Sequence, residues 1–163
     1  LCTAHRAENT NDEQRWQNIL SAISTISGTL PIIWPVHPRV RERVAKWQAA
    51  QQIDAKRIQL VSPLSYFETQ ALLSNARVLM TDSGGMQKEA AFHQVPCVTM
   101  RDETEWVELV ELGINTIVGA DTDKIIAAVS GAQWSIEALP DNLYGDGKTA
   151  FTIAQAIDEF LST

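Results

Sequence analysis

The residues best suited to chemistry in this chain are two adjacent glycines, Gly84 and Gly85, which directly follow Ser83. An apolar run precedes the pair and a helix-forming run, 86–92, follows it, so the glycines lie where a strand is expected to turn into a helix. The first amides of that helix have no intrahelical partner and lie at the positive end of its dipole, which favours phosphate. One helical turn beyond Gly85, the Glu89 carboxylate could accept two ribose hydroxyls. These residues predict a site for a nucleoside diphosphate.

Glycine pairs are common in turns, so this pair gains its meaning from the strand before it, the helix after it and the carboxylate one turn on. The segment does not match the G-x-G-x-x-G fingerprint of dinucleotide-binding folds, and it is not a Walker P-loop. Binding of NAD and cleavage of ATP are therefore disfavoured.

Two basic clusters follow other expected strands. His5 and Arg6 come after the first strand, where they could hydrogen-bond phosphate and neutralise a leaving group. His37 lies between Pro35 and Pro38, which restrict the backbone around it. For both clusters a purely structural role, in bonding loop carbonyls or capping a rigid turn, is an alternative.

A fourth polar cluster follows the strand at 97–100. Arg101 could reach a phosphate or a sugar substituent there, or serve only the loop. Thr104 is expected to cap the next helix, with Glu103 and Glu105 placed favourably at its dipole.

His93 and Trp34 are assigned to packing. The three histidines are scattered, and no Cys or carboxylate spacing matches a zinc or calcium motif, so no metal site is expected.

Length and charge limit the classes of function. The 163 residues suffice for one domain with a substantial core, and the net charge of −7 disfavours nucleic acid. No apolar run approaches the ~20 residues of a membrane span. Cys2 and Cys97 are lone thiols, which makes a disulfide framework unexpected and favours a cytoplasmic location. The chain starts at Leu1 in what reads as a strand end, so we expect a fragment cut on its N-terminal side.

Strand-like and helix-like runs alternate along the whole chain. The expected strands are 1–4, 32–36, 58–61, 78–81, 97–100 and 116–118. The expected helices run from a Thr10–Glu13 capping box to Gly28, through 40–47, from a Ser65–Glu68 capping box to Leu73, and over 86–92, 105–112, 122–129 and 148–161, with a polar loop at 139–147. This alternation predicts an α/β fold with a doubly wound, Rossmann-like parallel sheet, in which ligands bind at the carboxyl ends of the strands.

The polar clusters, taken in order, resemble the non-hydrolysing UDP-N-acetylglucosamine 2-epimerases. The matching motifs are T-A-H-R with E-N at 3–9, V-H-P at 36–38, T-D-S-G-G-M-Q-K-E-A at 81–90, R-D-E-T-E at 101–105 and Y-G-D-G-K at 144–148. The resemblance implies one half of a two-domain fold of the GT-B type, with the substrate in the cleft between the halves. Residues 1–163 are expected to be a single UDP-binding Rossmann-like domain, the C-terminal half, with the N-terminal half absent.

The resemblance also implies roles for the predicted site residues. Ser83, Gly84 and Gly85 would contact the diphosphate of UDP, and Glu89 would hold the ribose. Arg101 would lie near the diphosphate.

Two histidines complete the set that the resemblance implies. His5 would lie near the sugar as a histidine needed for activity. Arg6 and His37 match positions that, in bacterial members, help to bind a second, activating UDP-N-acetylglucosamine.

The family interconverts UDP-GlcNAc and UDP-ManNAc by removing the C2 proton, releasing UDP from C1 and adding it back. The resemblance implies no redox cofactor, a UDP-sugar as the substrate, no nucleic acid or membrane partner, and a homodimer for the full-length enzyme. Its acid and base carboxylates lie in the other domain, so this chain alone is expected to bind UDP weakly and to turn nothing over.

Three alternatives remain open. Segment 103–108 also resembles a sister group acting on UDP-2,3-diacetamido-2,3-dideoxyglucuronate. A GT-B glycosyltransferase shares the architecture, and a non-catalytic nucleotide-sugar-binding module would need the same site. Ala7 replaces an arginine common in the family, and Leu64 and Thr69 replace residues that relatives often use near the uracil.

Overall fold

The computed structural model describes residues 1–51, 54–132, 140 and 143–162. Its strands are β1 Cys2–Thr3, β2 Ile32–Pro35, β3 Ile58–Val61, β4 Leu79–Thr81, β5 Cys97–Thr99 and β6 Asn115–Ile117. All their pairings are parallel, in a ladder β1-β4-β5-β6 and a second ladder β2-β3. Because β1 also lies beside β2, the order across the molecule is 3-2-1-4-5-6. This is the doubly wound order, and it confirms the predicted Rossmann-like sheet.

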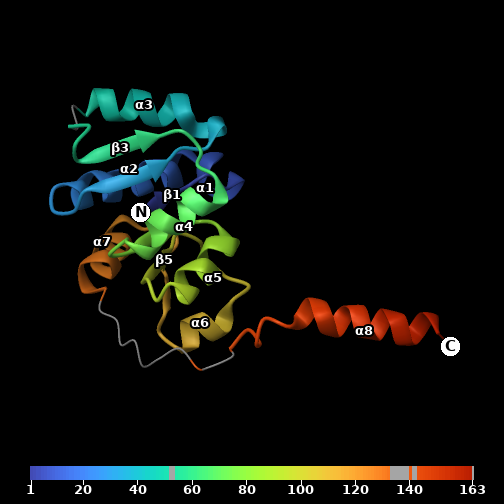
Figure 1. Ribbon diagram of the computed structural model, residues 1–163. Helices are drawn as coiled ribbons and strands as arrows, with labels where there is room; N and C mark the ends of the chain where they lie inside the picture. The colour runs from blue at the N-terminus through green and yellow to red at the C-terminus, as the bar shows by residue number, and fades with distance from the viewer. Residues whose placement is uncertain (52–53, 133–139, 141–142, 163) are drawn as a thin grey trace.

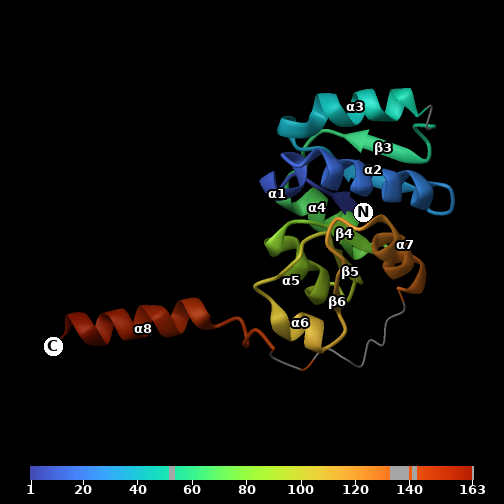
Figure 2. The same ribbon diagram turned by 180° about the vertical axis from the view of Figure 1, so that it is seen from behind.

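The helices cover both faces of the sheet. They are α1 Ala7–Thr10, α2 Glu13–Ser27, the 3-10 turn η1 Pro38–Val40, α3 Arg41–Ala50, α4 Tyr66–Ser74, α5 Gly84–Phe92, α6 Val107–Glu111, α7 Thr122–Gly131 and α8 Thr149–Leu161. Figure 1 is seen from the side of α4 and α5, and Figure 2 from the side of α2 and α7. The two faces therefore have separate hydrophobic cores.

The larger core lies under α2, α3 and α7. Helical spacing along α2 buries Trp16, Ile19 and Ile23 against the sheet. The Trp34 ring lies in the same core, with its centroid 6.3 Å from that of Trp16, which confirms its assignment to packing. The opposite face is held by smaller clusters beneath α4, α5 and α6.

The two predicted capping boxes had different outcomes. The Ser65–Glu68 box is confirmed, with the Ser65 N–H donating to Glu68 Oε2 at 2.8 Å. The Thr10–Glu13 box is wrong: Asp12 caps α2 by accepting the Arg15 N–H at 2.9 Å. Thr10 is already the last residue of α1, and its hydroxyl donates to the Arg6 carbonyl at 3.0 Å.

Helix α8 lies apart from the sheet, and both views show it extending away from the body (Figures 1 and 2). None of its residues is buried, and its apolar side chains Phe151, Ile153, Ile157, Phe160 and Leu161 are exposed. The loop predicted at 139–147 lies partly outside the described residues. Within the described ranges, no helix combines the length and the apolar character needed to cross a membrane.

Candidate functional site

The strand order reverses between β1 and β4, and in doubly wound sheets ligands bind outside the carboxyl ends of the strands at such a point. The parallel register places Thr3 opposite Thr81, so the residues that follow β1 and β4 emerge side by side. His5 and Arg6 follow β1, and Asp82 and Ser83 follow β4. The topology thus brings two of the predicted clusters together.

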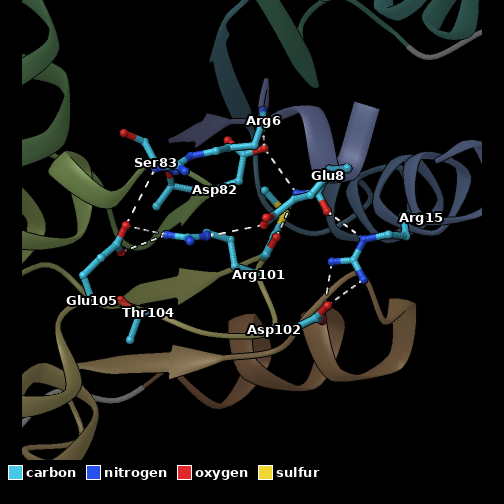
Figure 3. A network of polar contacts seen from close by, with 12 residues as sticks. Arg6, Glu8, Arg15, Asp82, Ser83, Arg101, Asp102, Thr104 and Glu105 are labelled. Carbon is cyan, nitrogen blue, oxygen red and sulfur yellow. Dashed lines mark hydrogen bonds and ion pairs between the residues drawn. The ribbon is translucent and has the colours of Figure 1, made fainter. Parts of the chain in front are cut away.

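The Asp82 carboxylate holds these two segments to each other. It is fully buried and accepts the backbone N–H groups of His5 and Arg6, each at 2.9 Å, and the Asn9 amide at 3.2 Å (Figure 3). Sequence reasoning gave no role to Asp82 or Asn9. The available signal was an acidic residue placed directly after a short, fully buried strand, where an unpaired charge would be very unfavourable.

The two predicted histidines also lie together. The rings of His5 and His37 stack with a centroid separation of 5.2 Å and an angle of 17°. His5 Nδ1 lies 3.5 Å from Asp82 Oδ1, and His37 Nδ1 accepts the Arg39 N–H at 3.2 Å. The capping role considered for His37 is therefore present, and the same ring lies against His5.

The first turn of α5 presents its backbone. Ser83 is the N-cap, but its side chain makes no capping bond, and the helix starts at Gly84, slightly earlier than expected. A Cβ built on Gly85 would meet nothing within 4 Å. These are the properties of an open anion-binding helix terminus.

A carboxylate from another segment lies beside this turn. A Cβ on Gly84 would lie 3.3 Å from Glu105 Oε2. The buried Arg101 donates through Nη1 to Glu105 Oε2 at 2.8 Å, and Arg6 Nη2 lies 3.9 Å from Glu105 Oε1 (Figure 3). Arg101 Nε also lies 3.4 Å from Glu8. The expected phosphate position thus has a carboxylate of the chain itself beside it, with both predicted arginines paired to it.

The electrostatics of Glu105 agree with this placement. The residue's own backbone N–H, with a smaller contribution from Arg101, lowers the pKa of its carboxyl group. Glu105 therefore remains charged in neutral solution, and it competes with any other anion for the two arginines.

Thr104 does not cap α6, which begins at Val107 with Trp106 as N-cap. Its hydroxyl accepts the Trp106 N–H at 3.1 Å and donates to Gln87 on α5. Trp106 Nε1 in turn donates to the Gly84 carbonyl at 2.8 Å. These contacts, which sequence reasoning missed, support the first turn of α5 from the side of α6.

The segment 144–148 is attached near the same place. The Tyr144 hydroxyl donates to Glu108 at 2.8 Å, and desolvation with that bond raises the pKa of Tyr144. Lys88 Nζ lies 4.1 Å from the centroid of the Tyr144 ring and 4.4 Å from that of Trp106. Tyr144, the first residue of the predicted motif, therefore packs on α5 and α6.

Glu89 lies on the side of α5 that faces α4, where Gln70 donates to its Oε2 at 2.8 Å. His93, which was assigned to packing, is hydrogen-bonded to Gln70 as well. Among the described residues, no cluster of three His, Cys, Asp or Glu side chains could hold a metal ion.

The family model for UDP-N-acetylglucosamine 2-epimerase matches residues 1–158. The chain belongs to this family. It is 40% identical over 158 residues to a UDP-N-acetylglucosamine 2-epimerase homolog of Methanococcus maripaludis, covering 96% of this chain and 43% of that protein. It is also 40% identical over 156 residues to the UDP-2,3-diacetamido-2,3-dideoxy-D-glucuronate 2-epimerase of Pseudomonas aeruginosa, covering 95% and 43%.

Solved structures agree with the sequence comparison. The UDP-GlcNAc 2-epimerase of Methanocaldococcus jannaschii in complex with UDP-GlcNAc and UDP matches with a TM-score of 0.81 and 34% identity, over 97% of this chain and 44% of that one. The predicted fold class, one Rossmann-like half of a two-domain fold of the GT-B type, is confirmed. This member of the family spans less than half the length of these relatives.

Proposed function

We propose that this chain is the UDP-binding half of a sugar-nucleotide 2-epimerase. The observation that carries the proposal is the open first turn of α5 at the point where the sheet reverses, with His5 and Arg6 held beside it by Asp82. Backbone amides at such a terminus suit a diphosphate. The bound UDP-GlcNAc and UDP of the Methanocaldococcus jannaschii relative supply the ligand class.

In this proposal Ser83, Gly84 and Gly85 contact the diphosphate, and Glu89 accepts the ribose hydroxyls. Arg101 reaches the diphosphate by exchanging its Glu105 partner for phosphate oxygens. This exchange keeps the same number of donors in use, because a guanidinium binds carboxylate and phosphate with the same N–H groups.

His5 acts at the bond that breaks. When UDP leaves C1, the electron pair of the C–O bond passes to the diphosphate oxygen, and negative charge develops there. The α5 amides, together with His5 and Arg6, would stabilise that charge in place. The acid and base that move the C2 proton are assigned to the other domain, so this chain alone should bind UDP without epimerising it.

Arg6 and His37 would form a second nucleotide-sugar site that activates the enzyme. The stack of His37 on His5 supports this proposal, because a ligand that touched His37 would change the surroundings of the proposed catalytic ring. The homodimer and the cytoplasmic location remain predictions.

The sister substrate UDP-2,3-diacetamido-2,3-dideoxyglucuronate is a second candidate, since the Pseudomonas aeruginosa relative is as similar as the Methanococcus maripaludis one. Assaying the full-length protein with both UDP-sugars separates the two. Turnover of neither would count against both, and consumption only with an added acceptor would favour a glycosyltransferase.

Calorimetric titration of the chain with UDP tests the site. Gly84→Val places a branched side chain at the proposed phosphate position, so we expect affinity to fall about tenfold or more. The nearest atoms to the new Cβ belong to the Glu105 carboxylate at 3.3 Å, which can move aside, so folding should survive.

Gly131→Val is the matched control, because a Cβ there meets nothing within 4 Å and the residue lies at the end of α7. It should leave UDP affinity unchanged. Equal affinity of the Gly84→Val and unmodified chains would refute the phosphate assignment, and robust epimerisation by this chain alone would refute the division of labour between the domains.

A further inference from the structure

Three polar side chains form a short relay beside the proposed ribose site. His93 Nε2 lies 2.7 Å from Gln70 Oε1, and Gln70 Nε2 donates to Glu89 Oε2 at 2.8 Å. Gln70 lies on α4, Glu89 lies on α5, and His93 is the C-cap of α5. These hydrogen bonds therefore connect two helices and end on Glu89, the residue expected to bind the ribose.

The chemistry of the groups fixes the direction of each bond. An ionised carboxylate only accepts hydrogen bonds, so the Gln70 amide must turn its NH₂ toward Glu89. Its carbonyl oxygen then faces His93, and that oxygen requires a donor. His93 must therefore carry its proton on Nε2, and the three groups form one consistent chain of donors.

Partial burial favours a single arrangement of these three side chains. All three side chains are half-buried, so water competes less well for their bonds than on an open surface. Beneath them, Leu73 of α4 and Ala90 of α5 lie in one buried cluster, which fixes the spacing of the two helices. A free glutamate side chain samples many rotamers, whereas Glu89 is held in one by a neighbour that is itself held.

The bond from Gln70 leaves Glu89 able to bind a ligand. A carboxylate offers about four acceptor positions, and Gln70 uses one of them at Oε2. Positions remain for both hydroxyls of a ribose. Neither hydroxyl bond requires that the relay be broken.

We propose that Gln70 and His93 are positioning residues that hold Glu89 in the orientation that binds the two ribose hydroxyls, and so make this chain selective for ribonucleoside over 2′-deoxyribonucleoside diphosphates. The inference rests on the proposed function, because it takes the diphosphate at α5 as given. It adds two residues and a source of sugar selectivity to that site.

The test compares UDP with 2′-deoxy-UDP by calorimetric titration of the whole chain. We expect the unmodified chain to prefer UDP by about tenfold, as for loss of one charge-assisted bond. Gln70→Met and His93→Phe should each lower UDP affinity about three- to tenfold. They should lower 2′-deoxy-UDP affinity less, because that ligand has only its 3′-hydroxyl to lose, so the preference for UDP should shrink. His93→Gln retains a donor and should keep most of it.

Gln48→Ala is the matched control. It removes another hydrogen-bonded glutamine side chain, whose Nε2 donates to the Ile58 carbonyl at 2.6 Å on the far side of the sheet. This variant should keep the preference for UDP. A thermal melt of each variant confirms that it folds.

The outcomes separate this inference from the proposed function. If the unmodified chain binds no UDP, both fail. If it binds UDP without preferring it to the deoxy form, the ribose role of Glu89 fails and the relay fails with it. If Glu89→Ala loses the preference while Gln70→Met and His93→Phe keep it, the relay alone is overturned.

Discussion

Two acidic side chains of the candidate site, Asp82 in its floor and Glu105 in its mouth, differ in burial and in partners. Asp82, in the floor, is fully buried and accepts two backbone N–H groups and an amide. Glu105, in the mouth, is half exposed and pairs with Arg6 and Arg101. Both lie at the same edge of the sheet.

The two carboxylates differ in whether a ligand could replace them at their hydrogen-bond donors. The floor's donors belong to the backbone, so no ligand can take them without unfolding the loop after β1. The mouth's donors belong to arginine side chains, which can bind phosphate in place of carboxylate. We infer that Asp82 builds the site and that Glu105 occupies it until a ligand arrives.

The strongest test of this comparison is Asp82→Ala. The change removes the acceptor of the His5 and Arg6 N–H groups and of one Asn9 amide hydrogen. We expect the free energy of unfolding to fall by about 3 kcal/mol or more. UDP binding should be lost at the same time, because His5 and Arg6 are no longer held beside α5. Urea denaturation measures the first effect and calorimetry the second.

Asp102→Ala is the control for that variant. Asp102 is also acidic and pairs with Arg15 at 2.9 Å, but its side chain is 72% exposed. Exposed ion pairs contribute about 0–1 kcal/mol, so this change should be nearly silent. Equal losses of stability and of UDP binding in the two variants would show that Asp82 is no more important to the site than an exposed loop carboxylate.

The sequence allowed the strands, the parallel sheet and the glycine turn to be predicted, because those depend on local apolar patterns and on residues that break them. It did not allow the stack of His5 on His37 to be predicted. That contact depends on β1 and β2 being neighbours, and order across a sheet is a long-range property.

The partners of Arg101 were hidden for a similar reason. The sequence shows an arginine four residues before Glu105. It does not show that this arginine is buried, or that Arg6, at the start of α1, approaches the same carboxylate. A single helix boundary also mattered: α6 begins at Val107 and not at Glu105, so Glu105 is free to turn toward α5.

The free energy of unfolding should fall at alkaline pH because of a buried thiol in the interior of the sheet. Burial raises the pKa of the Cys97 thiol, which lies in β5 next to β4, from 9.0 to about 12. Below pH 9 the thiol is protonated whether the chain is folded or unfolded, and its contribution to stability is fully present. As pH rises from 9 toward 12 only the unfolded chain ionises, so stability falls by about 1.4 kcal/mol per pH unit for this group.

Cys97→Ala should make that decline shallower in urea denaturation series. Cys2, whose pKa burial also raises to about 12, remains in this variant, so part of the decline should persist. An identical slope in both proteins would mean that the Cys97 thiol does not remain protonated inside the fold.

The smallest effect is expected for Glu105, in the mouth of the site, where a substitution should raise UDP affinity, whereas Asp82→Ala should abolish UDP binding. Glu105→Gln removes the charge that competes for Arg6 and Arg101, and we expect UDP affinity to rise about threefold in calorimetry. Because the pKa of Glu105 is lowered on folding, its contribution to stability is present above the ordinary glutamate pKa and is lost as pH falls through the lowered value. In the Glu105→Gln variant this small loss of stability at acidic pH should be absent.

Glu103→Gln makes the outcome specific, since it removes the same charge from the same exposed loop. If both variants bind UDP more tightly by the same factor, the gain comes from net charge alone. If Glu105→Gln binds more weakly, Glu105 orients Arg101 for the ligand. Glu105 would then be a structural part of the site, as Asp82 is. Only a gain confined to Glu105→Gln keeps the two regions distinct, with one carboxylate fixed by backbone donors and the other exchangeable for phosphate.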